Sequence, residues 1–273
     1  MAVYDGDEIG SEYLLEVAKA CIVAASRAPA LTINLGLKTE VLTGEDVMPL
    51  IDVMQTLGKI AGMLEMEGAT YRKILSDKKP MVIALFGADL TKAVGWNCGG
   101  CGFPTCAEFT KYVKKSKGQG TVALGPSCLW RAIDMGIAAD YACACAATHR
   151  VETRVQFTMG SMAMLLGRLE GSSIILGLPL ASGSDIWFDR RGIAGLYDYE
   201  HISKTITATS PNLQMTFTGV GNPMIKTKQR WWESPTVLKL EEDKEIAGKK
   251  MEAQNEVIKK IMEYRSAASK GKT

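Results

Sequence analysis

Three cysteines, Cys98, Cys101 and Cys106, lie within nine residues of one glycine-rich stretch, GWNCGGCGFPTCAEF (residues 95–109). A fourth, Cys128, follows in GPSCLW, so that the array reads C-x2-C-x4-C-x21-C. Closely spaced thiolates in a loop, completed by a more distant one, are typical of iron–sulfur cluster ligands. The glycines between them allow positive φ angles, which bring backbone N–H groups close to the sulfur atoms and help to set a reduction potential. The array therefore predicts a four-thiolate cluster site.

Two other chemistries fit parts of this pattern. A structural zinc site usually presents cysteines, or cysteines and histidines, in pairs, whereas Cys128 stands alone. A thioredoxin-like redox pair would use Cys98 and Cys101 as a C-G-G-C motif that opens a helix. A redox pair of this kind requires neither Cys106 nor Pro104. We favour the cluster and keep structural zinc as the outside alternative.

The remaining cysteines favour packing over chemistry. Cys21 lies in the apolar helical stretch VAKACIVAAS, where a lone thiol behaves as a small core residue. Cys143 and Cys145 are two apart on an expected helix, so they point to different faces. Six alanines between residues 138 and 147 predict close packing of that helix. His149 ends it, and we expect this histidine to interact with the helix dipole rather than to transfer protons.

Composition limits the class of protein. The chain has 273 residues, of which 47% are apolar and 23% charged, as in a globular protein with a sizeable core. The net charge of +2 argues against a nucleic-acid binder with a broad basic surface. The acidic N-terminus does not resemble a signal peptide, and the apolar runs are too short to span a membrane. We expect a cytoplasmic protein with reduced thiols, no nucleic-acid partner and no membrane span.

The expected elements mix helices and strands. Hydrophobic periodicity and turn residues predict the following helices and buried strands: helices at 11–27, 44–68, 106–118, 126–149 and 154–169, and strands at 79–87 and 172–179. We therefore expect one mixed α+β domain over residues 1–232, with the cluster segment at about 95–130. Residues 233–273 are mostly charged, with apolar residues near helical spacing, and predict a helical C-terminal arm.

The cysteine stretches resemble the four-cysteine [4Fe-4S] domain of corrinoid iron–sulfur proteins and of the B subunits of membrane electron-transport complexes. Over about residues 14–190 the chain is similar to the uncharacterised ferredoxin-domain proteins of anaerobic bacteria and archaea. The stretches that carry this similarity are AASRAPA, VLTGEDV, NCGGCGFPTC, DMGIAADYACACAATHRVE, TMGSMAM and IILGLPLASGSDIWFDR. The resemblance implies a redox protein of anaerobic metabolism that passes single electrons through one [4Fe-4S] cluster. It also implies a redox partner, either a ferredoxin or an oxidoreductase subunit.

The order of three short motifs along the chain also resembles, more weakly, that of nitroreductases, which are dimeric α+β flavoproteins. RAPALTIN resembles the turn that ends their first helix. Asp134 resembles the start of the D-x-G motif in their central helix, and Gly177–Pro179 resembles the G-x-P end of a later strand. This resemblance implies a nitroreductase-like sheet flanked by helices, a homodimer, and FMN between the subunits near the inserted [4Fe-4S] loop. The residues carried over to the flavin site are Ser26, Arg27, Ala28, Asn34, Gly177 and Pro179. In one respect the chain departs from the family, because residues 1–18 contain no Arg or Lys to hold the FMN phosphate.

Two functions from different classes follow. In the first, the protein is an iron–sulfur flavin oxidoreductase whose cluster feeds a flavin that reduces a small organic acceptor. In the second, it is a non-catalytic electron-transfer or scaffold subunit, docked into a larger complex by the C-terminal arm.

Overall fold

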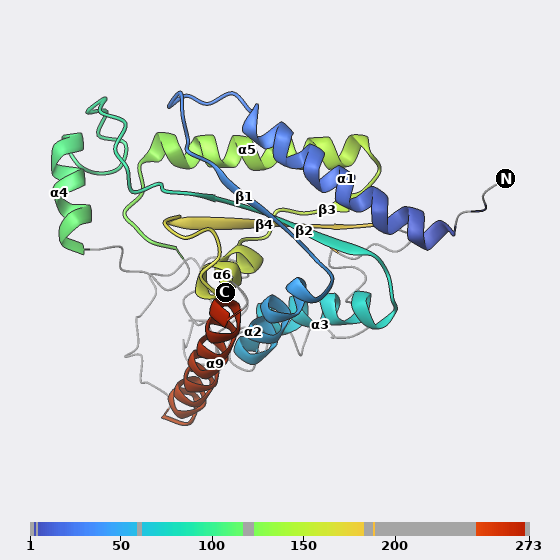
Figure 1. Cartoon of the computed structure of the whole chain (residues 1–273). Coiled ribbons are helices and arrows are strands. Elements are labelled where there is room, and N and C mark those ends of the chain that lie inside the picture. The colour runs from blue at the N-terminus through green and yellow to red at the C-terminus, as the bar shows by residue number, and fades with distance from the viewer. Residues whose placement is uncertain are drawn as a thin grey trace, which may run out of the picture. The chain divides into compact units, whose positions relative to one another are not determined.

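The computed structural model describes residues 3, 5–58, 62–116, 123–182, 188 and 244–270. Its elements are, in chain order (Figure 1), α1 (Gly6–Ser26), β1 (Lys38–Thr43), η1 (Gly44–Val47), α2 (Met48–Gly58), α3 (Gly62–Ser76), β2 (Met81–Ala88), α4 (Cys106–Ser116), α5 (Leu129–Thr148), β3 (Glu152–Thr153), α6 (Phe157–Leu165), β4 (Ile174–Ala181) and α9 (Lys244–Lys270). The chain divides into two compact units, one of Met1–Leu50 with Arg72–Asp189 and the other of Ile51–Tyr71 with Arg190–Thr273. The expected boundary at residue 232 lies outside the described residues and stays a prediction.

The first unit is built on a four-stranded antiparallel sheet in the order β1-β2-β4-β3. β2 pairs with β4 over eight residues, from Met81 opposite Ala181 to Ala88 opposite Ile174. Every residue of β2 is buried, as its continuous apolar run predicts. Antiparallel strands usually alternate apolar and polar residues because one face meets water. β2 does not alternate because helices cover both of its faces, and the expected α+β class is confirmed.

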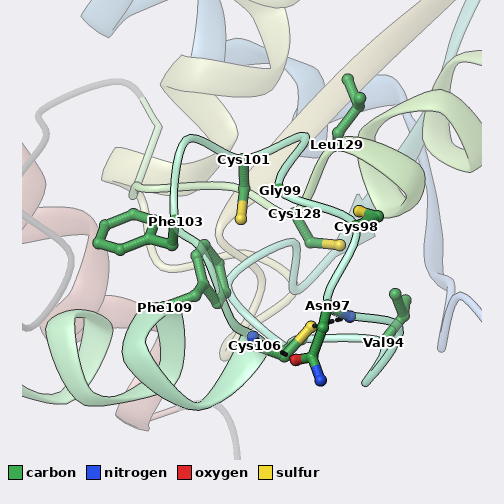
Figure 2. Close-up of a pocket in the computed structure, with 11 residues that line it drawn as sticks. Val94, Asn97, Cys98, Gly99, Cys101, Phe103, Cys106, Phe109, Cys128 and Leu129 are labelled. Atoms are coloured by element: carbon green, nitrogen blue, oxygen red, sulfur yellow. Dashed lines mark hydrogen bonds between the residues drawn. The ribbon is translucent and has the colours of Figure 1, made fainter.

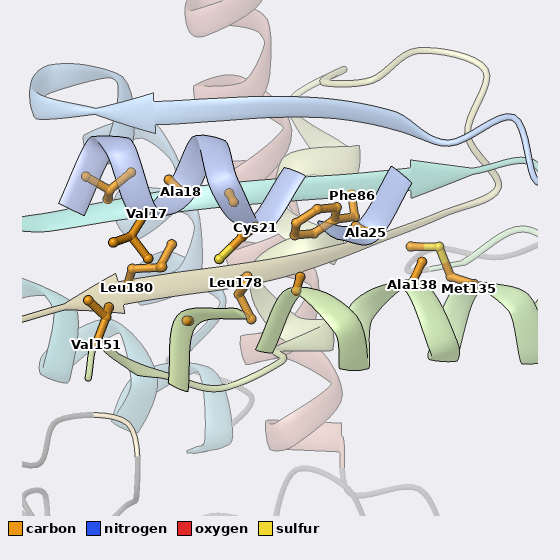
Figure 3. Packing of buried hydrophobic residues seen from close by; sticks show 14 of the residues in the cluster. Val17, Ala18, Cys21, Ala25, Phe86, Met135, Ala138, Val151, Leu178 and Leu180 are labelled. Carbon is orange, nitrogen blue, oxygen red and sulfur yellow. The ribbon is translucent and has the colours of Figure 1, made fainter. Parts of the chain in front are cut away.

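Helices α1 and α5 cover one face of the sheet (Figure 1). Alternate side chains of the two central strands point toward them, among them Phe86, Leu178 and Leu180 (Figure 3). The two helices meet through small buried residues, namely Ala18, Cys21 and Ala25 on α1 and Ala138, Ala142 and Ala146 on α5. The packing roles predicted for Cys21 and for the alanine-rich helix are confirmed.

Helix α6 covers the opposite face at very short range. A Cβ added at Gly160 would lie 1.8 Å from the carbonyl oxygen of Ile175, and one added at Gly177 would lie 2.5 Å from Met159 Cγ. Real Cβ atoms do not approach other atoms so closely, so a side chain at either position would push the helix off β4. These two glycines let α6 lie directly on the central strands.

The second unit contains the predicted C-terminal helix. In α9 the Lys260 ammonium donates to Thr56 Oγ1 at 2.8 Å, and the Tyr264 hydroxyl donates to Asp52 Oδ2 at 2.6 Å. Ala253 and Val257 are buried. The helical character of the arm is confirmed, and α9 packs on α2 within this unit. No helix in the described ranges is long and apolar enough to cross a membrane.

Two glycine substitutions test the close packing of α6 on the sheet. We expect Gly160→Ala to lower the free energy of unfolding by at least about 2 kcal/mol, because the new methyl group would overlap the Ile175 carbonyl. Gly136→Ala is the matched control, since that helical glycine of α5 has nothing within 4 Å of an added Cβ. It should be neutral or stabilising by up to about 1 kcal/mol. Urea unfolding measures both, and equal destabilisation would contradict the packing described.

Candidate functional site

The four predicted ligands come from three places around the end of β2. Cys98 and Cys101 lie in the loop after the strand, Cys106 is the first residue of α4, and Cys128 immediately precedes α5. All four line one pocket, and Figure 2 shows their thiols arranged around it. Residues far apart in the sequence therefore reach one hollow because β2 delivers the loop to the N-terminal end of α5.

The loop follows a glycine-dependent path. Gly99 and Gly102 have φ angles of 72° and 85°, a region in which a side chain is strained. The Gly102 N–H donates to the Gly99 carbonyl at 2.9 Å, which closes a tight turn around Cys101. The turn directs Cys98 and Cys101 toward the same pocket as Cys106 and Cys128.

Asn97 joins the start of the loop to the start of α4. Its side-chain oxygen accepts from the Cys106 N–H at 2.8 Å, and its own N–H donates to Cys106 Sγ at 3.4 Å. Its φ of 50° is one that asparagine tolerates better than most residues. Asn97 is a site residue that the cysteine spacing did not predict, although an Asn directly before the first cysteine of a glycine loop is a usable signal.

The Cys98 thiol receives two hydrogen bonds. The indole N–H of Trp130 lies 3.1 Å from Cys98 Sγ, and the Gly100 N–H is the second donor. The Gly100 backbone N–H and then the Trp130 indole lower the pKa of Cys98, because both stabilise its thiolate. Trp96 packs edge-on against Trp130, with ring centroids 5.7 Å apart. Trp130, two residues after Cys128, is a second site residue that the cysteine spacing did not predict.

Cys128 is the buried member of the set, with 4% of the residue exposed. Its N–H donates to the Leu90 carbonyl at 2.8 Å, just beyond the end of β2. Its backbone is extended and caps the N-terminus of α5. The start of this helix is thus fastened to the strand that carries the cysteine loop.

Arg131 and Asp134, in the first turns of α5, hold a second loop against the same helix. The buried Arg131 donates to the carbonyls of Asp89 at 2.9 Å, Asn34 at 3.2 Å and Leu35 at 2.5 Å. The Asp134 carboxylate accepts from the N–H groups of Leu31 at 2.7 Å and Thr32 at 2.9 Å. Arg131 therefore ties the loop after α1 to the chain that leads into the cysteine loop, a role that its sequence context does not reveal.

The residues carried over to a flavin site fall into two groups. Ser26, Arg27, Ala28 and Asn34 lie at the end of α1 and in the loop after it, while Gly177 and Pro179 lie on β4. Leu178 and Leu180 face α1 and α5, so Gly177 and Pro179 occupy the alternate positions, which face away from those helices. Within one chain the structure does not gather the six residues around one pocket, and their binding of FMN stays a prediction.

The other cysteines lie apart from the four-cysteine pocket. Burial, followed by the nearby Cys145, raises the pKa of Cys21 to about 12, and burial raises the pKa of Cys143. These thiols are protonated at neutral pH and make poor nucleophiles or ligands. His149 caps the C-terminus of α5, and its Nδ1 lies 2.6 Å from the Tyr13 hydroxyl oxygen, as expected for a helix-end histidine.

Alkylation rates test these thiol environments. In protein depleted of metal with a chelator, we expect iodoacetamide to modify Cys98 rapidly at pH 7 and Cys21 hardly at all, because only the thiolate reacts. Trp130→Phe removes one donor to Cys98 and should slow its modification severalfold. Trp96→Phe is the control, because it leaves that hydrogen bond in place. Mass spectrometry of the labelled peptides measures each rate, and equal rates in the two variants would contradict the assigned donor.

Comparisons with known proteins agree with this picture. The family model named FeS, for an Fe-S cluster, matches residues 95–119. The model described as "Uncharacterized protein containing a ferredoxin domain" matches residues 124–190, the segment that holds Cys128. One solved structure, B. megaterium NfrA2, aligns with 82% of this chain and 87% of its own at 15% identity and a TM-score of 0.36. That TM-score is too low to support an argument about function or cofactor.

An uncharacterized protein of Archaeoglobus fulgidus is 35% identical to this chain over 154 residues, which cover 54% of the chain and 81% of the relative. The iron–sulfur and ferredoxin-domain character expected from the cysteine array is confirmed by the two family models. On the coverage of this relative and on the matched ferredoxin-domain model, the chain belongs to the family of uncharacterized proteins containing a ferredoxin domain.

Proposed function

We propose that this chain binds one [4Fe-4S] cluster through Cys98, Cys101, Cys106 and Cys128 and passes single electrons in anaerobic metabolism. The observation that carries the proposal is that these four cysteines, from three separate segments, line one pocket. When bound, such a cluster supplies one-electron redox chemistry. The chain's own residues hold the thiolates, donate hydrogen bonds to them and limit their contact with water.

The arrangement of the thiols favours a cluster over a single zinc ion. Zinc draws its four ligands to one point, with each sulfur about 2.3 Å from the metal. Structural zinc sites usually present their cysteines in pairs. Here a single distant cysteine, Cys128, completes a glycine loop that holds the other three, and the four line one pocket; this spacing supports an iron–sulfur centre.

Hydrogen bonds and burial give the chain control over the reduction potential. Cys98 receives N–H donors from Gly100 and Trp130, and Cys106 receives one from Asn97. Donors of this kind stabilise the additional negative charge of a reduced cluster. The apolar Phe103, Phe109 and Leu129 line the same pocket. Its environment is therefore partly dry and rich in N–H donors, as an electron-transfer centre requires.

Metal analysis of two matched variants tests the ligand set. Anaerobically purified wild-type protein should contain about four irons and about four acid-labile sulfides per chain. Cys128→Ser should lower or abolish that content because it removes the ligand that closes the site. Cys143→Ser is the control, since Cys143 lies outside the four-cysteine pocket, and it should retain the iron. Equal behaviour of the two variants would mean that Cys128 is not the fourth ligand, and one zinc without iron would reject the cluster.

The destination of the electrons separates the two remaining functions. Arg131 links Asn34, in the loop expected to bind FMN, to Asp89, which precedes the cysteine loop, and this link supports a flavin close to the cluster. A flavin absorbance band in the same preparation is the result expected of a flavin oxidoreductase. A cluster without flavin, co-purifying with a dehydrogenase or reductase, would instead indicate a non-catalytic electron-transfer subunit.

A further inference from the structure

An open hollow adjoins the four-cysteine pocket on the outside of the molecule. Ala93, Val94 and Cys106 line both, so only one layer of side chains separates them. The remaining wall of the outer hollow comes from α4, where Lys111 and Lys114 are the charged residues. One predicted cluster ligand therefore lies at the floor of a basic surface.

The positive charge of this surface is not neutralised nearby. Lys111 and Lys114 are exposed, and no ion pair joins either to a carboxylate among the described residues. They are three apart on α4 and share one face of the helix, and Lys115 follows directly. Glu108 is the one acidic residue of this helix. The helix dipole favours lysines in the last turn, but it does not explain Lys111, which lies in the middle of α4.

The form of the hollow suits a protein rather than a small molecule. Pockets for small ligands enclose most of the ligand surface, whereas this hollow opens widely to solvent. Its lining combines small apolar residues, including Ala93, Val94 and Ala107, with two lysines of α4. An apolar centre beside a charged rim is typical of protein interfaces. Transient electron-transfer complexes use small contacts of this kind, with charge guiding the encounter.

We propose that the surface of Lys111, Lys114, Ala93, Val94 and Cys106 is the docking site for an acidic one-electron carrier protein of the ferredoxin class. The inference rests on the proposed function, because the carrier exchanges electrons with the centre held by the four cysteines. One electron leaves the reduced carrier, which is oxidised by one electron, and the centre is reduced by one electron. No bond forms or breaks, and no proton moves. Cys106 lies on this path because it lines both hollows.

The test compares two double charge reversals in the full, cluster-loaded chain. Lys111→Glu with Lys114→Glu reverses the proposed surface. Lys78→Glu with Lys79→Glu is the matched control, with the same change in net charge. These two lysines precede the first residue of β2, whereas the cysteine loop follows its last residue, so the control lies at the opposite end of an eight-residue strand. Iron content and circular dichroism establish that each variant is folded and loaded.

The probe is an acidic bacterial two-cluster ferredoxin, and two quantities are measured. Binding of the oxidised ferredoxin is titrated at several NaCl concentrations, and electron transfer from the reduced ferredoxin is followed by stopped flow. We expect Lys111→Glu with Lys114→Glu to weaken binding and slow the bimolecular rate at least about tenfold at low salt, and to flatten the salt dependence. At an ionic strength of about 0.1 M the control should stay within about threefold of wild type, because salt then screens charges beyond about 10 Å.

Several outcomes would overturn the docking site. They are equal loss in both double variants, wild-type binding by the Lys111→Glu, Lys114→Glu variant, or no binding of wild type to the ferredoxin at low salt. Competition by inorganic phosphate at constant ionic strength would indicate a small-anion site and would also contradict it. Failure of the proposed function is separate, because it shows as absent iron in the wild-type chain. A loaded chain whose binding ignores Lys111 and Lys114 rejects only the docking surface.

Discussion

The hydrogen bond from the Cys128 N–H to the Leu90 carbonyl is the contact on which the candidate site depends. It fastens the N-terminus of α5 to the chain just beyond β2, so that a cysteine before the helix meets three cysteines after the strand. The bond is buried with Cys128, and a buried backbone hydrogen bond is costly to lose. Without it, the fourth thiol would not have a defined position relative to the loop. The pocket is thus a property of the junction between strand and helix.

Helix α5 serves both the core and the site. Its small residues pack against α1 over the sheet. This packing fixes the distance of α5 from the sheet and its orientation about its own axis. The N-terminal end of the helix then carries Trp130, Arg131 and Asp134, with Cys128 directly before it. Trp130 reaches the Cys98 thiol, while Arg131 and Asp134 hold the loop after α1. A rigid core helix is a suitable support for metal ligands. Small displacements of the groups that contact a ligand change the reduction potential of the metal centre and the affinity for the metal.

The two faces of the sheet carry different constraints. On the α1 and α5 face, alanines and Cys21 set the spacing between the helices. On the α6 face, Gly160 and Gly177 allow the helix to touch the backbone of β4. Together they bury β2 on both sides, so every residue of the strand that delivers the cysteine loop is buried. The loop itself lies at the edge of this core, where Cys98 is exposed and Cys106 half-buried.

The local sequence pattern was sufficient to predict much of the secondary structure and the cysteine loop of this protein. The spacing of four cysteines and the glycines among them predicted a thiolate cluster loop, because the ligand types and the backbone freedom can be read from nearby residues. The family models support its iron–sulfur character. The apolar run of β2 and the small-residue period of α5 likewise specified a buried strand and a closely packed helix. The roles of Asn97, Trp130, Arg131 and Asp134 were not visible in the sequence, because each depends on a partner in a distant segment or in an irregular loop. Only the tertiary structure decided that Cys128 faces the loop, that Arg131 joins two loops, and that Lys111 and Lys114 border the wall next to Cys106. Those relations depend on the antiparallel register and on helix packing, which bring together residues that no local pattern connects.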